Sequence, residues 1–507
     1  MKKPKSRFWP KLAWCAAATA VVLQGFVSRQ APPPRAADSA PPSHAWDVLC
    51  VGSNRTFGHL QSAAMPSDQE CRNAFTTSAL AAWCGYLRSA WGYDELSPVS
   101  ATPHEEWLGL AITAADSLGT LVLMGMDAQA AATAELMVAR TSTFSPGIRT
   151  NVFEATIRTL GGLVSAHALT KDDRLLAAAS RLAQNMSGVF RTPTGIPFAY
   201  VDLAAATPLA AIPHGKNITD LETSVSEAGS LSLEFEALTH AMNVSFIAPR
   251  LAMERIATRC ESGLAPGRYI KSHVDGWGAD TNVTISAHAD SFYEYMLKSW
   301  IIGGKTEAHL LAWHHNFVHG VTTRLLARSP RDGFLFVGRT EDDVFVAEME
   351  QLACFYPGLL ALAHIHNVSD PPDAYADDHA ATLEALGVSG GQMGVARELI
   401  LTCMAMADRT ATGLAPEATA FERLPGEDSS LHVTGADTMV RRQSEGFKLR
   451  PETVESLYVM HAATGDAEYK AMAWRLWLAL ERSARVPGGY TRLHNVMEHG
   501  SYDDHQV

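Results

Sequence analysis

Apolar residues recur along most of the chain at the spacing of one face of an α-helix. One stripe consists of Phe153, Ile157, Leu160 and Val164. This spacing is that of a helix facing a core. Similar stripes recur near residues 75–90, 106–125, 171–186, 221–242, 287–302, 348–364, 389–407, 450–464 and 466–482. Strand-like alternation is confined to short pieces such as 332–340, so the pattern predicts an all-α chain.

The helical stripes show neither a fixed repeat period nor heptads, and Gly and Pro separate them. We therefore expect antiparallel helix pairs that close into a barrel or toroid. A helix bundle is the alternative, and an α-solenoid is disfavoured because it needs a regular period.

The N-terminal segment departs from this pattern. Basic residues precede an apolar run from Leu12 to Val27, and a Pro- and Ala-rich stretch follows it. The run is short for a spanning helix, which needs roughly 17–25 residues, and long for a signal-peptide core. We expect residues 1–30 to be a signal peptide or, preferably, a signal-anchor holding a single-pass type II protein in the membrane. Residues 31–67 would form a stem, and 68–507 the main domain in the secretory lumen.

Composition narrows the classes of partner. The formal net charge of -13 excludes a general nucleic-acid binder, which needs clustered Lys and Arg. Six N-glycosylation sequons agree with a secretory location: Asn54, Asn185, Asn217, Asn243, Asn282 and Asn367.

Of the seven cysteines, Cys15 lies in the apolar segment, and the other six could pair in an oxidising lumen. The sequence contains no CxxC or Cys/His cluster, so we expect no zinc site.

Several predicted helices begin with charged residues beside their apolar stripe. These residues are Glu154 with Arg158, Glu227, Asp290, and Arg450 with Glu452 and Glu455. Each acid could simply lie at the N-terminus of its helix, where a negative charge stabilises the helix by about 0.3–1 kcal/mol. The recurrence of the feature in four segments instead favours a shared acidic pocket. Such a pocket suits glycoside hydrolysis, which needs one protonated and one ionised carboxyl group.

Several stretches resemble, in order along the chain, a known family. They include ADSLGTLVLMGM, VFEATIRTLGGLVSAH, SEAGSLSLEFEAL, ADSFYEYMLKSW, MEQLACFYPGLLAL, TGLAPE and LRPETVESLYVMHAATGD. The resemblance, from about Asp68 to Tyr490, is to the class I α-mannosidases of glycoside hydrolase family 47, which trim N-glycans. It implies an (α/α)7 barrel, a calcium ion at the bottom of the pocket and hydrolysis with inversion.

The resemblance also implies residue roles. Glu154 matches the general acid, which delivers its proton through water, Glu452 the general base, and Asp290 a third catalytic carboxylate. The positions that line the mannose and calcium site are Arg158, Glu227, Arg450 and Glu455, and the disulfide pair is Cys354 and Cys403. Inversion predicts acid and base carboxyl groups roughly 6.5–9.5 Å apart.

Three positions depart from the family pattern. Gly119 replaces an acid, Gln351 replaces a pocket histidine, and His288 stands where the ER-type enzymes carry an arginine. The last change favours a Golgi-type enzyme.

The largest departure is the C-terminal end. Family members continue to a MESF block, a last helix and a threonine that is the calcium ion's only direct protein ligand. The sequence stops before this block, so we expect a barrel incomplete at its C-terminal end and name no metal ligand. We expect an incomplete gene model or splice product rather than an inactive protein.

The sequence therefore predicts a calcium-dependent mannosyl-oligosaccharide α-1,2-mannosidase that acts on high-mannose N-glycans in the Golgi or ER. The alternative is a catalytically inactive, mannose-binding lectin-like factor in ER glycoprotein quality control.

Overall fold

The computed structural model describes residues 49–50, 65–104, 107–209, 222–368, 370–371, 373–422 and 431–504. The α-helices are α3 (Asp68–Ala90), α4 (Ile112–Leu123), α5 (Asp127–Arg140), α6 (Val152–Glu154), α7 (Gly161–Thr170), α8 (Asp173–Met186), α9 (Val225–Gly229), α10 (Ser232–Met242), α11 (Ala248–Ala257), α12 (Asp290–Ile302), α13 (Ala308–Arg324), α14 (Tyr356–Ile365), α15 (Asp373–Ala385), α16 (Gly391–Asp408), α17 (Glu452–Thr464) and α18 (Glu468–Ser483). A π-helix, η2 (Ala155–Leu160), joins α6 to α7, and the 3-10 segments are η3 (Ser187–Phe190), η4 (Gln351–Phe355) and η5 (Arg442–Ser444).

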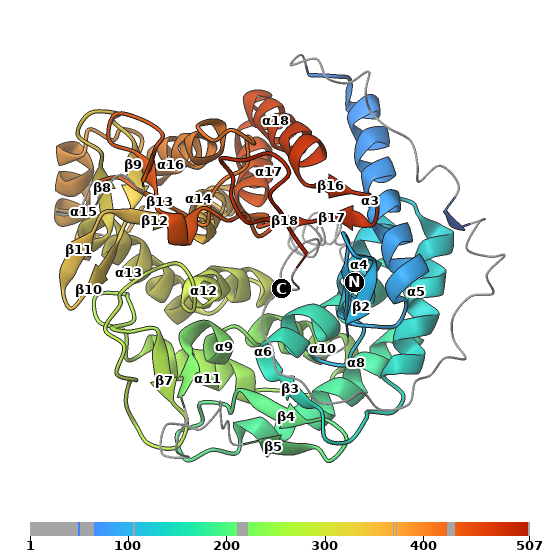
Figure 1. The fold of residues 1–507 in the computed structure, drawn as a ribbon. Coiled ribbons are helices and arrows are strands. Elements are labelled where there is room, and N and C mark those ends of the chain that lie inside the picture. The colour runs from blue at the N-terminus through green and yellow to red at the C-terminus, as the bar shows by residue number, and fades with distance from the viewer. Residues whose placement is uncertain are drawn as a thin grey trace, which may run out of the picture.

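Helices follow one another around a ring, from α3 through α8, α12 and α16 to α18 (Figure 1). Consecutive helices pack as pairs: α4 with α5, α7 with α8, α12 with α13, and α17 with α18. First members of neighbouring pairs also pack together, as α4 does with α7, α10 with α12, and α14 with α17. The prediction of an all-α chain built from helix pairs is therefore confirmed.

The inner helices approach closely where glycines stand in their interfaces. A Cβ atom at Gly162 of α7 would lie 2.4 Å from the carbonyl oxygen of Ala115 in α4. A Cβ atom at Gly358 of α14 would lie 2.7 Å from the Ser456 hydroxyl of α17. Because each glycine omits this atom, the two backbones can pack at short range.

The strands are short and pair antiparallel at the ends of the helix pairs. They are β1 (Glu95–Ser97), β2 (Thr102–His104), β3 (Arg149–Asn151), β4 (Tyr200–Asp202), β5 (Thr207–Leu209), β6 (Glu222–Ser224), β7 (Tyr269–Lys271), β8 (Leu326–Arg328), β9 (Leu335–Val337), β10 (Arg339–Glu341), β11 (Val344–Val346), β12 (Glu348–Glu350), β13 (Ala418–Ala420), β14 (His432–Val433), β15 (Met439–Val440), β16 (Arg485–Val486), β17 (Gly489–Tyr490), β18 (Arg492–Leu493) and β19 (Tyr502–Asp503). The largest sheet has the order β12-β13-β15-β14. Strands β3, β6 and β12 lead directly into α6, α9 and η4, so they position the starts of inner segments.

The first and last helices of the described ring contact each other. The Phe75 ring of α3 lies 5.9 Å from the Trp474 ring and 5.5 Å from the Trp477 ring of α18. The Ser78 hydroxyl donates a hydrogen bond of 2.6 Å to Glu481. These contacts join the two ends of the described ring (Figure 1).

Two disulfides are present in the described part of the chain. Cys354–Cys403 joins η4 to α16, as the family resemblance implied, and Cys50–Cys84 ties the segment before α3 to that helix. The expectation that six cysteines could pair is wrong for Cys71 and Cys260, which remain thiols. The side chain of Cys15 lies outside the described residues.

None of the helices in the described ranges is both long enough and apolar enough to cross a membrane. The apolar run from Leu12 to Val27, on which the membrane prediction rests, lies outside those ranges.

Candidate active site

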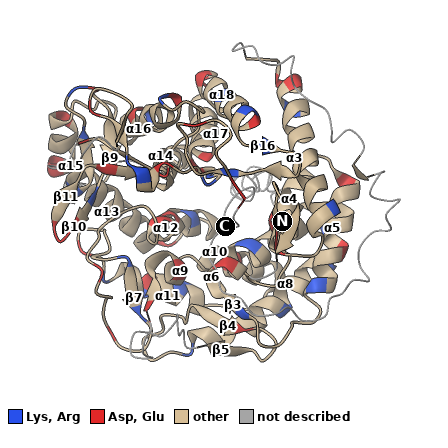
Figure 2. Cartoon of the chain, in the orientation of Figure 1, with Lys and Arg blue, Asp and Glu red and all other residues tan. Residues whose placement is uncertain are grey.

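The predicted site residues come from the starts of four inner segments. Glu154 ends α6, Glu227 lies in α9, Asp290 opens α12 and Glu452 opens α17. Acidic and basic residues line the inner side of the ring near α6, α9 and α12 (Figure 2). Side-chain contacts connect these segments in sequence.

Asn151 links the segment of Glu154 to that of Glu227. Its Oδ1 accepts a hydrogen bond of 3.0 Å from the Glu154 backbone N–H, and its Nδ2 donates one of 2.8 Å to Glu227 Oε1. The second oxygen of Glu227 accepts the backbone N–H of Ser224 at 3.0 Å, which completes a capping box at the start of α9. Glu227 therefore both caps a helix and faces the Glu154 segment.

The next contact connects α9 to Asp290. Ser226 Oγ and the Ser291 backbone N–H donate hydrogen bonds of 2.7 Å and 2.8 Å to Asp290 Oδ1. Burial raises the pKa of Asp290 to about 6, although these hydrogen bonds act to lower it.

Glu452 is buried, and its Oε2 has no hydrogen-bond partner among the described residues. Burial raises the pKa of Glu452 to about 8, and the neighbouring Glu455 and Asp290 carboxyl groups raise it further, against the opposing effect of Arg450. The charge of Arg450 acts on Glu452 and on Asp290, and in both it favours the ionised carboxyl group. A buried carboxyl oxygen without a partner is costly, so this atom is suited to a ligand.

Arg450 is held by a carboxylate that the sequence interpretation did not include. Its Nε and Nη2 donate to the carboxylate of Glu417, with a shortest distance of 2.6 Å. The pair fixes the guanidinium next to Glu452 and Asp290, whose charges both raise the pKa of Arg450.

On the other side of the site, Arg158 joins two acids. Its Nε donates to Glu154 Oε2 at 2.7 Å, and its Nη1 donates to Asp116 Oδ2 at 3.0 Å. Its guanidinium also lies 5.0 Å from the centre of the Trp107 ring. Burial raises the pKa of Asp116 to about 6. Arg158 projects from the π-helix η2, a geometry that is frequent at functional sites.

The Lys298 ammonium lies between α12 and α17, where it contacts two carboxylates. Lys298 donates to Glu294 one turn earlier in α12, and its ammonium lies 3.8 Å from Glu455 Oε1. Burial raises the pKa of Glu455 and Lys298 lowers it.

All seven predicted site residues thus belong to a network of neighbouring inner segments. The roles assigned to Glu154, Asp290 and Glu452 stay predictions from the family resemblance. The residues that sequence reasoning missed are Asp116, Asn151, Glu294, Lys298 and Glu417. Four of them lie inside sequence blocks that carry the family resemblance, which was the available signal.

The three departures from the family pattern have distinct surroundings. Gln351 is buried and donates through Nε2 to the Thr453 hydroxyl at 3.3 Å, beside Glu452. His288 is exposed, in the left-handed region with φ 74°, and its ring lies 5.3 Å from that of Tyr269. Gly119 lies opposite Ser165, whose hydroxyl would be 3.3 Å from an added Cβ.

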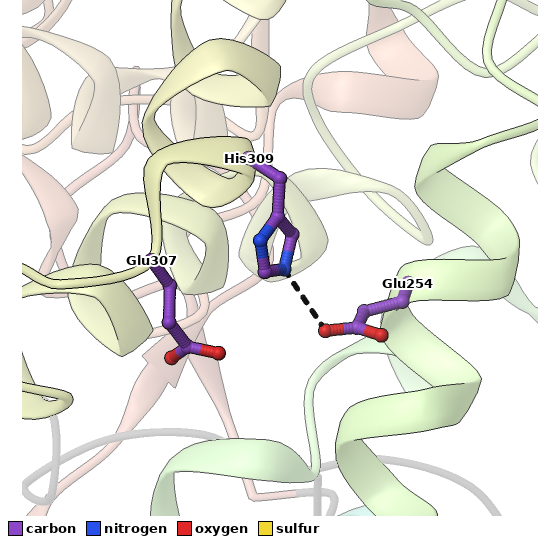
Figure 3. Close-up of side chains that lie close together, drawn as sticks. All are labelled: Glu254, Glu307 and His309. Carbon is purple, nitrogen blue, oxygen red and sulfur yellow. Dashed lines mark hydrogen bonds and ion pairs between the residues drawn. The ribbon is translucent and has the colours of Figure 1, made fainter.

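In the described part of the chain, one group of three side chains has the spacing of a metal site: Glu254, Glu307 and His309. Figure 3 shows the His309 ring directed at Glu254, with Glu307 alongside. The guanidinium of Arg250 already forms ion pairs with both carboxylates. Glu254 lies on α11, Glu307 immediately precedes α13 and His309 lies on α13. The group is outside the network of the inner helix starts, so it is not the predicted calcium site.

Comparison with known proteins agrees with this geometry. Residues 78–507 match the family model of glycosyl hydrolase family 47. The chain is 34% identical over 426 residues to the human endoplasmic reticulum mannosyl-oligosaccharide 1,2-alpha-mannosidase, covering 83% of this chain and 56% of the relative. It is 30% identical over 438 residues to mannosyl-oligosaccharide 1,2-alpha-mannosidase MNS1 of Arabidopsis thaliana, covering 85% of this chain and 71% of that protein.

Among solved structures, the alpha-1,2-mannosidase from Trichoderma reesei matches with a TM-score of 0.71 and 23% identity, over 85% of this chain and 89% of that one. This likeness shows the (α/α)7 barrel fold. The chain spans little more than half the length of the human relative, 56%. Together the family match and the shared fold establish that the chain belongs to glycosyl hydrolase family 47.

Proposed function

We propose that this protein is a glycosidase, a mannosyl-oligosaccharide α-1,2-mannosidase that releases terminal α-1,2-linked mannose from high-mannose N-glycans with inversion. Family membership and the names of the relatives support the reaction and the substrate class. The single observation that carries the proposal is the buried Glu452 carboxyl group, whose Oε2 has no hydrogen-bond partner among the described residues. A purely structural helix cap would have both oxygens satisfied or hydrated.

The proposed roles follow the contacts. Glu154 would donate the proton to the glycosidic oxygen through water, and Arg158 holds its carboxyl group in place. Glu452 would activate the attacking water, for which it must be ionised. Burial raises the pKa of Glu452 to about 8 and opposes this ionisation, and a further positive charge beside that of Arg450 would favour the ionised base.

The residues present fit a calcium ion in this position. The Lys298 ammonium contacts the carboxyl groups of Glu294 and Glu455, while Arg450, whose charge acts on Asp290 and Glu452, is already paired with Glu417. Calcium prefers six to eight oxygen ligands, including water and carboxylates. Glu452 and Glu455 would hold the hydrated ion through water, and its charge would favour the ionised base.

We further propose that the protein works in the lumen of the secretory pathway, in the ER or Golgi. Relatives named as ER mannosidases support the pathway. A membrane anchor at Leu12–Val27 stays a prediction from sequence. The alternative is a protein that binds mannose without catalysis, which would bind the glycan but release no sugar.

The test is to incubate the purified full chain with a high-mannose N-glycan and calcium, and to follow the released sugar by NMR. The proposal predicts β-mannose as the first product, and loss of release when calcium is chelated. Initial α-mannose would contradict inversion. Glycan binding without any release would favour the lectin-like alternative.

A further inference from the structure

Three N-glycosylation sequons lie entirely within the described residues, and their asparagines have different surroundings. Asn185 Nδ2 donates a hydrogen bond of 2.8 Å to the carbonyl oxygen of Leu203. Asn282 uses both ends of its carboxamide, since Nδ2 donates to Asp280 at 3.1 Å and Oδ1 accepts from Arg339 at 3.0 Å. Both nitrogens are engaged in internal contacts, Asn185 on α8 and Asn282 in the loop before α12, where a sugar would have to fit beside the partner.

Asn243 differs from these two because it faces solvent. It follows the last residue of α10 and has φ 56°, the left-handed conformation that asparagine adopts readily at helix ends. Asn243, Val244 and Ser245 are all exposed, so the whole sequon is accessible. In the Asn282 sequon, by contrast, Thr284 is only 6% exposed.

Large apolar side chains lie exposed directly after Asn243. Val244 is 45% exposed, Ile247 59% and Leu251 46%. The Leu251 backbone N–H donates to the Ile247 carbonyl oxygen, so these two side chains lie one helical turn apart on the same face. Single exposed apolar residues are ordinary, but three exposed apolar side chains within eight positions, beginning beside a sequon, call for a cover. We define Val244, Ile247 and Leu251 as the apolar strip.

We propose that Asn243 carries an N-linked glycan whose first sugars cover the apolar strip. The proposal rests on the proposed lumenal location, where the host's transferase supplies a lipid-diphosphate-linked oligosaccharide. Asn243 Nδ2 forms a bond to C1 of the reducing-end N-acetylglucosamine and loses one proton. The bond from C1 to the diphosphate oxygen breaks, and the lipid diphosphate leaves. The C–H faces of the first sugars then remove the aliphatic side chains from water.

The first test is site occupancy. The full chain is produced in a eukaryotic secretory host, and its peptides are analysed by mass spectrometry with and without enzymatic deglycosylation. We expect Asn243 to be occupied, and Asn185 and Asn282 to be unmodified. Unmodified Asn243 beside occupied sequons elsewhere would overturn this inference and leave the proposed enzyme intact. Unmodified asparagines throughout would overturn both the inference and the lumenal location.

The second test asks whether the glycan on Asn243 shields the apolar strip from solvent. The matched variants are Ser245→Ala, which destroys the sequon, and Ser245→Thr, which keeps it. We expect Ser245→Ala to lack the mass of one glycan. We also expect it to bind more of a dye whose fluorescence rises on exposed apolar surface. Adding Ile247→Gln and Leu251→Gln to Ser245→Ala should abolish that gain.

Equal dye binding by the Ala and Thr variants would contradict the proposed cover. Amidase removal of the glycan from the folded wild-type protein provides a second comparison. The enzyme adds water across the Asn243 side-chain amide bond, so at this site only the carboxamide changes, to a carboxylate. This comparison therefore decides the question even if Ser245→Ala folds poorly.

Discussion

At the residue scale, acids at helix starts have different partners in this protein. Glu227 closes a capping box with Ser224, as the simple helix-cap interpretation expects. Glu452 opens α17 without a side-chain cap, and its Oε2 has no partner among the described residues. The same sequence feature therefore marks a structural cap in one segment and an available carboxyl oxygen in another.

The Arg450–Glu417 pair provides a test at this scale. Replacing Glu417 by Gln removes the negative charge and leaves the guanidinium half-buried, next to Glu452 and Asp290. We expect a loss of about 1–3 kcal/mol in the free energy of unfolding, together with a lower kcat. Urea unfolding and mannose release measure the two effects. Glu422→Gln, at an exposed position, is the matched control and should change neither.

The pH dependence of stability gives a second test. Burial raises the pKa of Glu234 to about 7 from its usual 4.5, although Tyr295 donates a hydrogen bond to it. Between these values the folded protein binds a proton that the unfolded chain lacks, so this group lowers stability as pH rises through the window. The free energy of unfolding of Glu234→Gln at pH 8 should therefore exceed that of the wild type by about 1–3 kcal/mol, because one pKa unit equals about 1.4 kcal/mol.

At pH 4 the Glu234→Gln and wild-type proteins should have similar stability, because the carboxyl group is then protonated in both states. Thermal unfolding at the two pH values measures the difference. If Glu234→Gln were more stable than wild type by the same amount at pH 4 and at pH 8, the charge of Glu234 would not be the cause of the difference.

Single residues were predictable where a sequence block carried them, as for Glu154, Asp290 and Glu452. The contacts that hold the neighbouring arginines were not predictable, because Asp116 lies 42 positions from Arg158 and Glu417 lies 33 positions from Arg450. Such contacts depend on how the helix pairs close, which no local pattern encodes.

At the element scale, close packing of the inner helices depends on glycine. Gly162→Ala would place Cβ 2.4 Å from the Ala115 backbone oxygen, which cannot move away cheaply. We expect a loss of about 1–3 kcal/mol in the free energy of unfolding, measured in urea. The neighbouring Gly161→Ala is the control, since its Cβ would meet Glu234 Cγ at an ordinary 3.4 Å. Equal effects of the two substitutions would mean that the α4–α7 approach is not tight.

Apolar periodicity predicted the inner helices α4, α7, α12, α14 and α17, whose surroundings are largely apolar. It did not delimit α5, α11, α13 or α15. Alanine and histidine supply much of their surfaces, as in α5 and α13, so their apolar stripes are weak. The predicted helix at 348–364 begins instead as strand β12, because β12 pairs with β13, which lies far along the chain. The π-helix η2 has no signature in the pattern used.

At the scale of the whole molecule, the Cys354–Cys403 disulfide joins η4 to α16 across 49 positions. Chain entropy predicts that opening a loop of this length costs about 4 kcal/mol of stability. We expect the Cys354→Ser, Cys403→Ser double variant to lose this amount in urea unfolding, and Cys260→Ser, which replaces a free thiol, to lose little. An unchanged double variant would show that the cross-link does not stabilise the fold.

The arrangement of helix pairs in a ring followed from the sequence pattern, and the (α/α)7 barrel from the family resemblance that the comparisons confirm. The segments predicted before Asp68 fall almost entirely outside the described residues, so the anchor and the stem stay predictions. Calcium also stays a proposal, which rests on the excess of carboxyl groups around Glu452.

The most direct measurement is mannose release by Glu452→Gln, compared with wild type and with Glu468→Gln at the exposed start of α18. If Glu452 activates the attacking water, its Gln variant should lose at least about 100-fold in kcat, with glycan binding and thermal unfolding retained. Glu468→Gln should turn over like wild type. Unchanged turnover by a folded Glu452→Gln protein would contradict the account.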